Sequence, residues 1–157
     1  LLVWADDKTS ANTNVTQLHV PFKLAKGGEA IGLFSPQGAA IDAVVFGTQS
    51  ANISEGRYPD SGGLRLFLPE PSPGSPNILP PPSGPPVVSD IGVQPDGSCL
   101  ITFEASPGHT YRIEFKNELD ESFWQQLGTD HFATGTLQFI SDVSNAPHRF
   151  YRISLVQ

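Results

Sequence analysis

Hydrophobic and polar residues alternate along much of the second half of the chain, in short runs separated by turn residues. In "TYRIEFK", Tyr111, Ile113 and Phe115 fall on one face of a predicted strand and charged residues on the other. Similar runs are "VVSDIGVQ", "SCLITFEA", "FWQQLGTD", "GTLQFISDV" and "HRFYRISLV". The turn sequences "PDGS", "SPGHT" and "ATGT" lie between them, and "NELDESFW" is consistent with one short helical turn capped by Asn117. This pattern predicts a small antiparallel β-sandwich.

The best-patterned stretch of the first half is "GEAIGLFSPQGAAIDAVVFG", from Gly28 to Gly47. Two apolar runs flank "SPQG", where Pro36 presets a turn and Gly38 can adopt the positive φ that follows. We therefore expect a β-hairpin. Further strands are expected at "LLVWAD" and "QLHVPFKL", with weaker signals at "ISEGRYP" and "GLRLFLP". An independent sandwich of so few strands would be only marginally stable, because a small domain buries a smaller share of its surface.

A proline-rich segment, "PEPSPGSPNILPPPSGPP", separates the two patterns and holds nine of the fifteen prolines. Proline lacks the N–H group that a central strand or a helix needs, so this segment should be an extended connector. We place a first module at residues 1–72, a Pro-rich linker at 73–86 and a second module at 87–157.

Composition supports an all-β fold and excludes some partners. Hydrophobic residues make up 38% of the chain, enough for a packed core, and Gly and Pro number 15 each. The net charge is −7 and the basic residues are scattered, so we expect no nucleic-acid binding and no attraction to an anionic membrane surface. No apolar run reaches the ~18 residues of a membrane span. The single cysteine, Cys99, excludes an internal disulfide, and its place in an alternating run predicts a buried thiol.

The candidate metal ligands are Asp6 and Asp7, whose carboxylates could help to hold Ca²⁺. Successive residues of a strand face opposite ways, however, so only one of the two can point into a given site. A solvated strand end is therefore the preferred interpretation. The acidic stretch 118–121 lacks the glycine and spacing of a calcium-binding loop, and the four histidines show no zinc-binding spacing.

Catalytic chemistry has little support in the sequence. Ser54, His19 and Asp42 could be combined into a hydrolytic triad, but no nucleophile-elbow sequence surrounds the serine. Phosphate- or dinucleotide-binding glycine motifs are absent as well. We predict no catalytic residues, no cofactor-binding residues and no cofactor.

Aromatic residues leave a second interpretation open. A flat row of rings on a sheet face is a common way to bind sugars, and the candidates are Trp4, Tyr58, Phe123, Trp124 and Phe132. Trp124, however, lies where a sandwich places its core aromatic, so we expect it in the core.

Several phrases of the first half, in order, resemble the C-terminal half of a bacterial lamin-tail (LTD-type) domain. They are "WADD" at Trp4–Asp7, "H-x-x-F-K-L" at His19–Leu24, "GE-x-I-x-L" at Gly28–Leu33, "ID-x-V-x-F" at Ile41–Phe46, "S-x-GR-x-PD" at Ser54–Asp60 and "PSPGSPN" at Pro71–Asn77. The second half resembles, more loosely, small C-terminal β-sandwich modules of secreted bacterial multi-domain proteins. The phrases that carry this likeness are "GHTYRIEF", "W-x-x-LGT" at Trp124–Thr129 and "RFYRI" at Arg149–Ile153.

The resemblance implies two immunoglobulin-like β-sandwich modules, the first of them truncated, because the strands of the first half of a lamin-tail domain have no counterpart here. It also implies a non-catalytic interaction or structural module of a larger exported bacterial protein, secreted or on the cell surface, that serves adhesion, spacing or partner docking. A protein or a cell-surface polymer would be the partner. Unpaired strand edges of the first module predict a homodimer at high concentration. The alternative is a carbohydrate-binding module attached to a secreted hydrolase.

Overall fold

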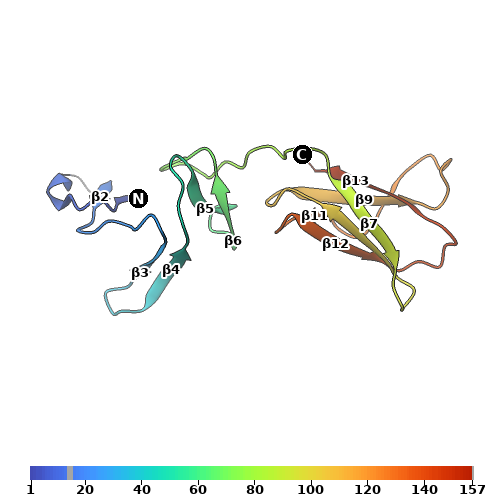
Figure 1. The fold of residues 1–157 in the computed structure, drawn as a ribbon, viewed down its shortest axis with the longest axis horizontal. Coiled ribbons are helices and arrows are strands. Elements are labelled where there is room, and N and C mark those ends of the chain that lie inside the picture. Colours follow the sequence, from blue (N-terminus) through green and yellow to red (C-terminus); the bar gives the residue numbers. More distant parts are fainter. Residues whose placement is uncertain (14–15, 157) are drawn as a thin grey trace. The chain divides into compact units, whose positions relative to one another are not determined.

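The computed structural model describes residues 1–13 and 16–156, and these residues form strands, turns and one short 3₁₀ segment but no α-helix (Figure 1). The prediction of an all-β chain is confirmed. The chain divides into two compact units, Leu1–Ile78 and Leu79–Gln157. This division falls inside the segment 73–86 that the sequence analysis assigned to a linker.

In unit 1, residues Leu1–Ile78, the strands pair two by two. The pairs are β1 (Leu2–Trp4) with β2 (Gln17–His19), β3 (Glu29–Phe34) with β4 (Ala40–Phe46), and β5 (Ser54–Tyr58) with β6 (Leu64–Leu68). The β1–β2 pair is parallel, and the 3₁₀ segment η1 (Thr9–Ala11) lies between its two strands in the sequence. The other two pairs are antiparallel. The unit is thus built from small sheets of two strands each.

The predicted hairpin is confirmed as β3 and β4. Its turn is closed by the Gly38 N–H, which donates to the Ser35 carbonyl at 2.9 Å, and Gly38 has a φ of 83°. Glycine reaches this left-handed region without the steric cost that a Cβ atom would add. A register shift between Leu33 and Phe34 marks a bulge at the end of β3.

Unit 1 has very little core. Among its described residues, Leu68 is the only fully buried apolar side chain. Large apolar side chains on β3 and β4 remain exposed, including Leu33, Phe34, Ile41 and Val45. The small sheets therefore leave apolar surface uncovered.

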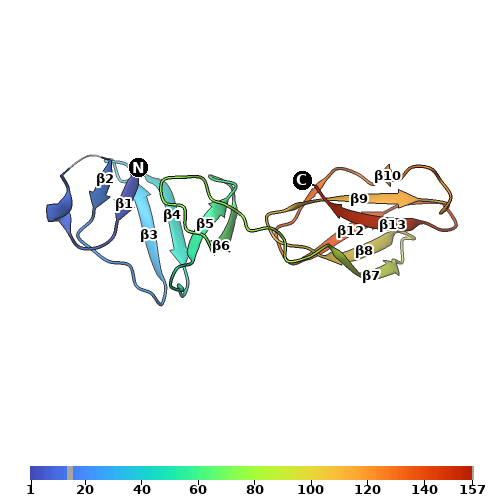
Figure 2. The same cartoon turned by 90° about the horizontal axis from the view of Figure 1, so that it is seen from above.

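Unit 2, residues Leu79–Gln157, consists of two antiparallel sheets that face each other (Figure 2). One has the order β12–β8–β7, built from β12 (Leu137–Asp142), β8 (Cys99–Glu104) and β7 (Val87–Val93). The other is centred on β9 (Thr110–Lys116), which pairs with β13 (Phe150–Leu155) on one edge and with β10 (Gln125–Gln126) and β11 (His131–Phe132) on the other. Phe103, Tyr111 and Ala133 form the buried cluster between the sheets, which agrees with the predicted β-sandwich.

The chain crosses from one sheet to the other between β8 and β9. At this crossing the Ser106 N–H donates to the hydroxyl oxygen of Tyr111 at 2.8 Å. The Tyr111 ring is buried and meets Phe103 edge to face, with ring centroids 5.8 Å apart. One side chain thus fixes the loop and fills the core.

Two local expectations for unit 2 need correction. The segment after β9 forms a turn, closed by the Glu121 N–H to the Glu118 carbonyl, rather than a helical turn. Asn117 does not cap it, because its side-chain oxygen accepts from Arg149 instead. The strand expected at "FWQQLGTD" is reduced to β10, since Gly128 turns the chain with a φ of 67° before β11 begins.

Candidate functional site

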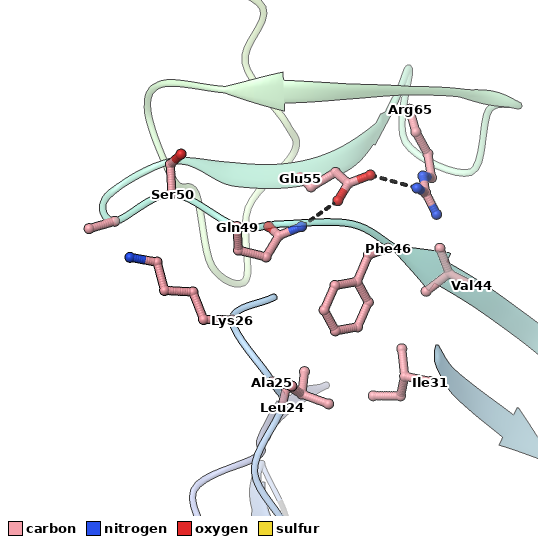
Figure 3. A pocket seen from close by; sticks show the side chains of 11 residues that line it. Leu24, Ala25, Lys26, Ile31, Val44, Phe46, Gln49, Ser50, Glu55 and Arg65 are labelled. Carbon is pink, nitrogen blue, oxygen red and sulfur yellow. Dashed lines mark hydrogen bonds and ion pairs between the residues drawn. The ribbon is translucent and has the colours of Figure 1, made fainter. Parts of the chain in front are cut away.

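A cavity of unit 1 lies on one face of the β3–β4 hairpin (Figure 3). It has a volume of about 530 Å³. Its apolar wall consists of Ile31 from β3, Val44 and Phe46 from β4, and Leu24 and Ala25 from the segment before β3. Cross-strand pairing explains this wall, because Ile31 lies opposite Val44 and side chains of paired residues share a face.

The opposite wall of this cavity is polar, with an ion pair between Glu55 and Arg65 and with Lys26 and Gln49 beside it (Figure 3). The Glu55 carboxylate accepts from the Arg65 guanidinium at 2.6 Å and from the Gln49 amide at 2.7 Å. Arg65 also donates to the Val45 carbonyl at 2.7 Å, so it ties β6 to β4. Glu55 is held by two donors, one of them the charged Arg65, and so serves as a structural acceptor between β5 and its neighbours.

The other face of the same hairpin is apolar as well. Ala30, Gly32 and Phe34 from β3 and Ala43 and Val45 from β4 line a hollow of about 330 Å³. A hairpin with one solvated face would carry polar residues on that face. Apolar side chains on both faces instead indicate a surface that is suited to contact with another molecule.

The candidate calcium ligands do not converge. Asp6 binds the Nδ1 atom of His19 at 3.0 Å, whereas Asp7 is exposed and has a φ of 60°. Partial loss of hydration would raise the pKa of Asp6, but the hydrogen bond and the charge of His19 outweigh it and lower the pKa. In the described ranges, 1–13 and 16–156, no group of three or more His, Cys, Asp or Glu side chains is placed to hold a metal ion.

The residues of the hypothetical triad each have another partner. The Arg57 guanidinium donates two hydrogen bonds to the Asp42 carboxylate, at 2.6 and 2.8 Å, and these bonds lower the pKa of Asp42. The Ser54 hydroxyl donates to the Leu68 carbonyl, and His19 is held by Asp6. The structure therefore does not bring the three together into a catalytic arrangement.

The tryptophans are engaged in contacts of their own. Trp4 stacks on His19 with ring centroids 6.4 Å apart. Trp124 is half-buried and lies outside the buried core cluster, so the expectation that it is a core residue is wrong. The guanidinium of Arg152 lies 4.6 Å from the centre of its ring and the Lys116 ammonium 5.2 Å, which makes it a cation–π platform.

Unit 2 contains a polar cluster that the sequence analysis missed. Asp142, only 3% exposed, accepts from Arg149 at 2.6 and 2.9 Å and from the Tyr151 hydroxyl at 2.8 Å. Burial, followed by the hydrogen bond to Asp142, raises the pKa of Tyr151 well above its usual value. Cys99, expected to be buried, is a half-buried free thiol near this hydroxyl. The sequence carried no signal for it, because the alternation in "LQFISD" favours Leu137 and Phe139 as the inward residues, whereas these are exposed and Asp142 is buried.

Taken with the fold, these features define an all-β chain with an apolar, two-faced hairpin in one unit and a packed pair of sheets in the other. Comparison with known protein families, curated proteins and solved structures finds no match to the chain. Within the part of the chain that the structure describes, no helix is long and apolar enough to cross a membrane.

Proposed function

We propose that the chain is a non-catalytic interaction or structural module of a larger exported bacterial protein, with a role in adhesion, spacing or partner docking. The observation that carries this proposal is the apolar surface of the β3–β4 hairpin. Phe34 of β3 and Val45 of β4, which line the same hollow, are 57% and 74% exposed although they belong to one short hairpin. Contiguous apolar surface of this kind marks interaction sites on soluble proteins.

The backbone of the same hairpin supports docking. β3 and β4 pair only with each other among the described strands, so each presents an outer edge to solvent. Free strand edges are templates for pairing with another chain. The Arg65 contact to the Val45 carbonyl occupies one acceptor on the β4 edge, which leaves the edge of β3 as the more accessible of the two.

Kinship with the bacterial lamin-tail domain is part of the proposal. The matching phrases begin at the end of β1, follow β2, β3, β4 and β5 in order, and end with Pro71–Asn77, after β6. For unit 2 we propose an immunoglobulin-like sandwich. Two facing sheets of order β12–β8–β7 and β10/β11–β9–β13, with a tyrosine hydroxyl fixing a crossing between them, support this assignment.

The partner that we propose for the hairpin is a second copy of the chain, by way of the β3–β4 surface. A protein or polymer of the cell surface would use the same apolar faces. Sugar stacking on the tryptophans has no comparable support, because their rings are already stacked on His19 or overlain by Lys116 and Arg152.

Sedimentation velocity tests this proposal across a concentration range from about 1 µM to about 1 mM, over which a weak dimer forms by mass action. The wild-type chain should shift toward the dimer as concentration rises. The double variant Phe34→Ser/Val45→Lys should stay monomeric, because it removes apolar contact and adds like charges at the interface.

Leu119→Lys is the matched control, since Leu119 is an exposed apolar residue of unit 2. It should dimerise like the wild type. A wild-type chain that is monomeric throughout the range contradicts the dimer. In that case, binding to an array of cell-surface polysaccharides that the double variant abolishes would still support docking by this hairpin.

A further inference from the structure

The sandwich of unit 2 is open along one side. Side chains at paired positions share a face, so Ile91 and Val93 of β7 point to the same inner side as their partners Ile101 and Cys99 of β8. Ile101 is completely buried, yet Ile91 is 50% and Val93 80% exposed. The inner face of β7 is therefore not covered by the opposite sheet.

The opposite side of the sandwich is closed. On β12 the inward residues Gln138 and Asp142 are buried. His131 of β11 contacts the Gln138 amide oxygen at 2.7 Å, which places β11 across from β12. Tyr151 of β13 also donates to Asp142 of β12, at 2.8 Å. β12 therefore faces both β11 and β13, which flank β9, so β7 lies beyond β13 and the uncovered side of the sandwich is the side of β13.

The outer edge of β13 borders this opening. The Val156 N–H donates to the Thr110 carbonyl of β9, and antiparallel pairing alternates between bonded and non-bonded pairs. The backbone groups of Tyr151, Ile153 and Leu155 therefore point away from β9. Among the described residues no strand pairs with this edge.

This edge lacks two of the features that usually protect an edge strand, and its one charged residue, Arg152, is paired with Glu114 of β9. Residues 150–155 contain no proline and no bulge. The other edge of the same sheet is interrupted between β10 and β11, and β7 carries a bulge between Val88 and Asp90. The edge of β13 and the inner face of β7 together form what we call the open seam.

We propose that the open seam binds one extended peptide segment of a protein partner, which adds a strand to β13. The unpaired backbone groups of β13 lie at three alternate positions, and an extended strand can pair with all of them. A helix cannot, because it satisfies its N–H and C=O groups internally. In an added strand, the residues opposite Tyr151, Ile153 and Leu155 point inward, over Ile91 and Val93. The segment should therefore carry apolar residues at alternate positions, with polar residues between them.

This proposal rests on the proposed interaction role but uses unit 2 instead of the β3–β4 hairpin. The two tests are therefore independent, since variants of the hairpin leave the open seam intact and variants of the seam leave the hairpin intact. Failure of one does not imply failure of the other.

The probe is the peptide acetyl-KVTVTVK-amide, titrated into the full chain below the concentration at which the chain self-associates. Amide hydrogen exchange, measured by NMR, should slow at Tyr151, Ile153 and Leu155 as the peptide saturates the open seam. The amides of Arg152 and Ser154 should change little, because they already pair with β9. The same peptide with methylated valine nitrogens should not bind, since it cannot donate to the edge.

Variants test the inner face of β7, which forms the apolar part of the open seam. Val93→Lys should weaken peptide binding about tenfold or more, because it replaces apolar contact with a charge. Val143→Lys, at a highly exposed site that does not belong to the seam, should bind as the wild type does. Both positions are exposed, so neither change should prevent folding.

Three results would overturn the proposal. One is equal binding of the methylated and unmethylated peptides, and another is the absence of saturable binding. The third is slow exchange at Tyr151, Ile153 and Leu155 in the free chain. If that protection appears only as chain concentration rises, the occupant of the seam is a second copy.

Discussion

At the scale of single residues, Asp142 shows how one charge organises unit 2. It lies on β12, yet its partners Arg149 and Tyr151 lie before and within β13. Arg149 is also placed 3.9 Å from the centre of the Phe115 ring and donates to the side chain of Asn117. A buried carboxylate needs such partners, because an unpaired charge is costly to remove from water.

Asp142→Asn should therefore lower the free energy of unfolding by about 3–5 kcal/mol, since it leaves Arg149 largely buried without its opposite charge. Urea denaturation followed by fluorescence measures this change. Glu118→Gln is the control, because Glu118 contacts His148 only at the surface, and its effect should be small. A similar loss in both variants would contradict a special role for Asp142.

At the scale of elements, the crossing from β8 to β9 depends on Tyr111. Its hydroxyl accepts the Ser106 N–H, and the neighbouring Gly108 N–H donates to the Ala133 carbonyl at 2.8 Å. The Ala133 N–H in turn donates to the His109 carbonyl at 2.9 Å. The loop is thereby fastened both to the start of β9 and to the segment after β11.

Tyr111→Phe should destabilise unit 2 by about 1–3 kcal/mol, because it leaves the Ser106 N–H without its acceptor while the ring still fills the core. Ser106→Ala is the matched control: the donor is the backbone N–H, so the bond should survive. Thermal or urea unfolding of the two variants provides the comparison. Equal stability of Tyr111→Phe and the wild type would show that water replaces the hydroxyl.

At the scale of the whole molecule, the two units differ in how much apolar surface they bury. Unit 2 holds the buried residues Ile101, Phe103, Tyr111, Ile113 and Ala133, whereas Leu68 stands alone among the described residues of unit 1. Apolar burial is the main favourable term in folding, so the units should differ in stability.

Hydrogen exchange followed by mass spectrometry should show β3 and β4 exchanging well before β8 and β9 in the monomeric chain. The expected cause is the small buried core of unit 1, which permits local opening at low cost. Raising the chain concentration should slow exchange in β3 and β4 if the hairpin dimerises. Uniform protection across both units at low concentration would contradict independent stability of the units.

Much of the fold could be predicted from sequence because it depends on neighbouring residues. Alternation in "TYRIEFK" and the glycine at position 38 act over a few residues, and both led to correct elements. The short β10 was not foreseen, since a turn at Gly128 overrides the alternation around it. The parallel pairing of β1 with β2 joins residues more than ten positions apart, so local patterning carried no signal for it.

The sequence by itself determined the all-β class, the β3–β4 hairpin and most strands of unit 2, because backbone preference and side-chain alternation are local properties. Only the tertiary structure decided that Asp142 meets Arg149, that Trp124 lies outside the core, and that the β13 edge remains open. These features depend on which distant segments pack together. That choice is made by the burial of the whole unit and not by any one stretch of the chain.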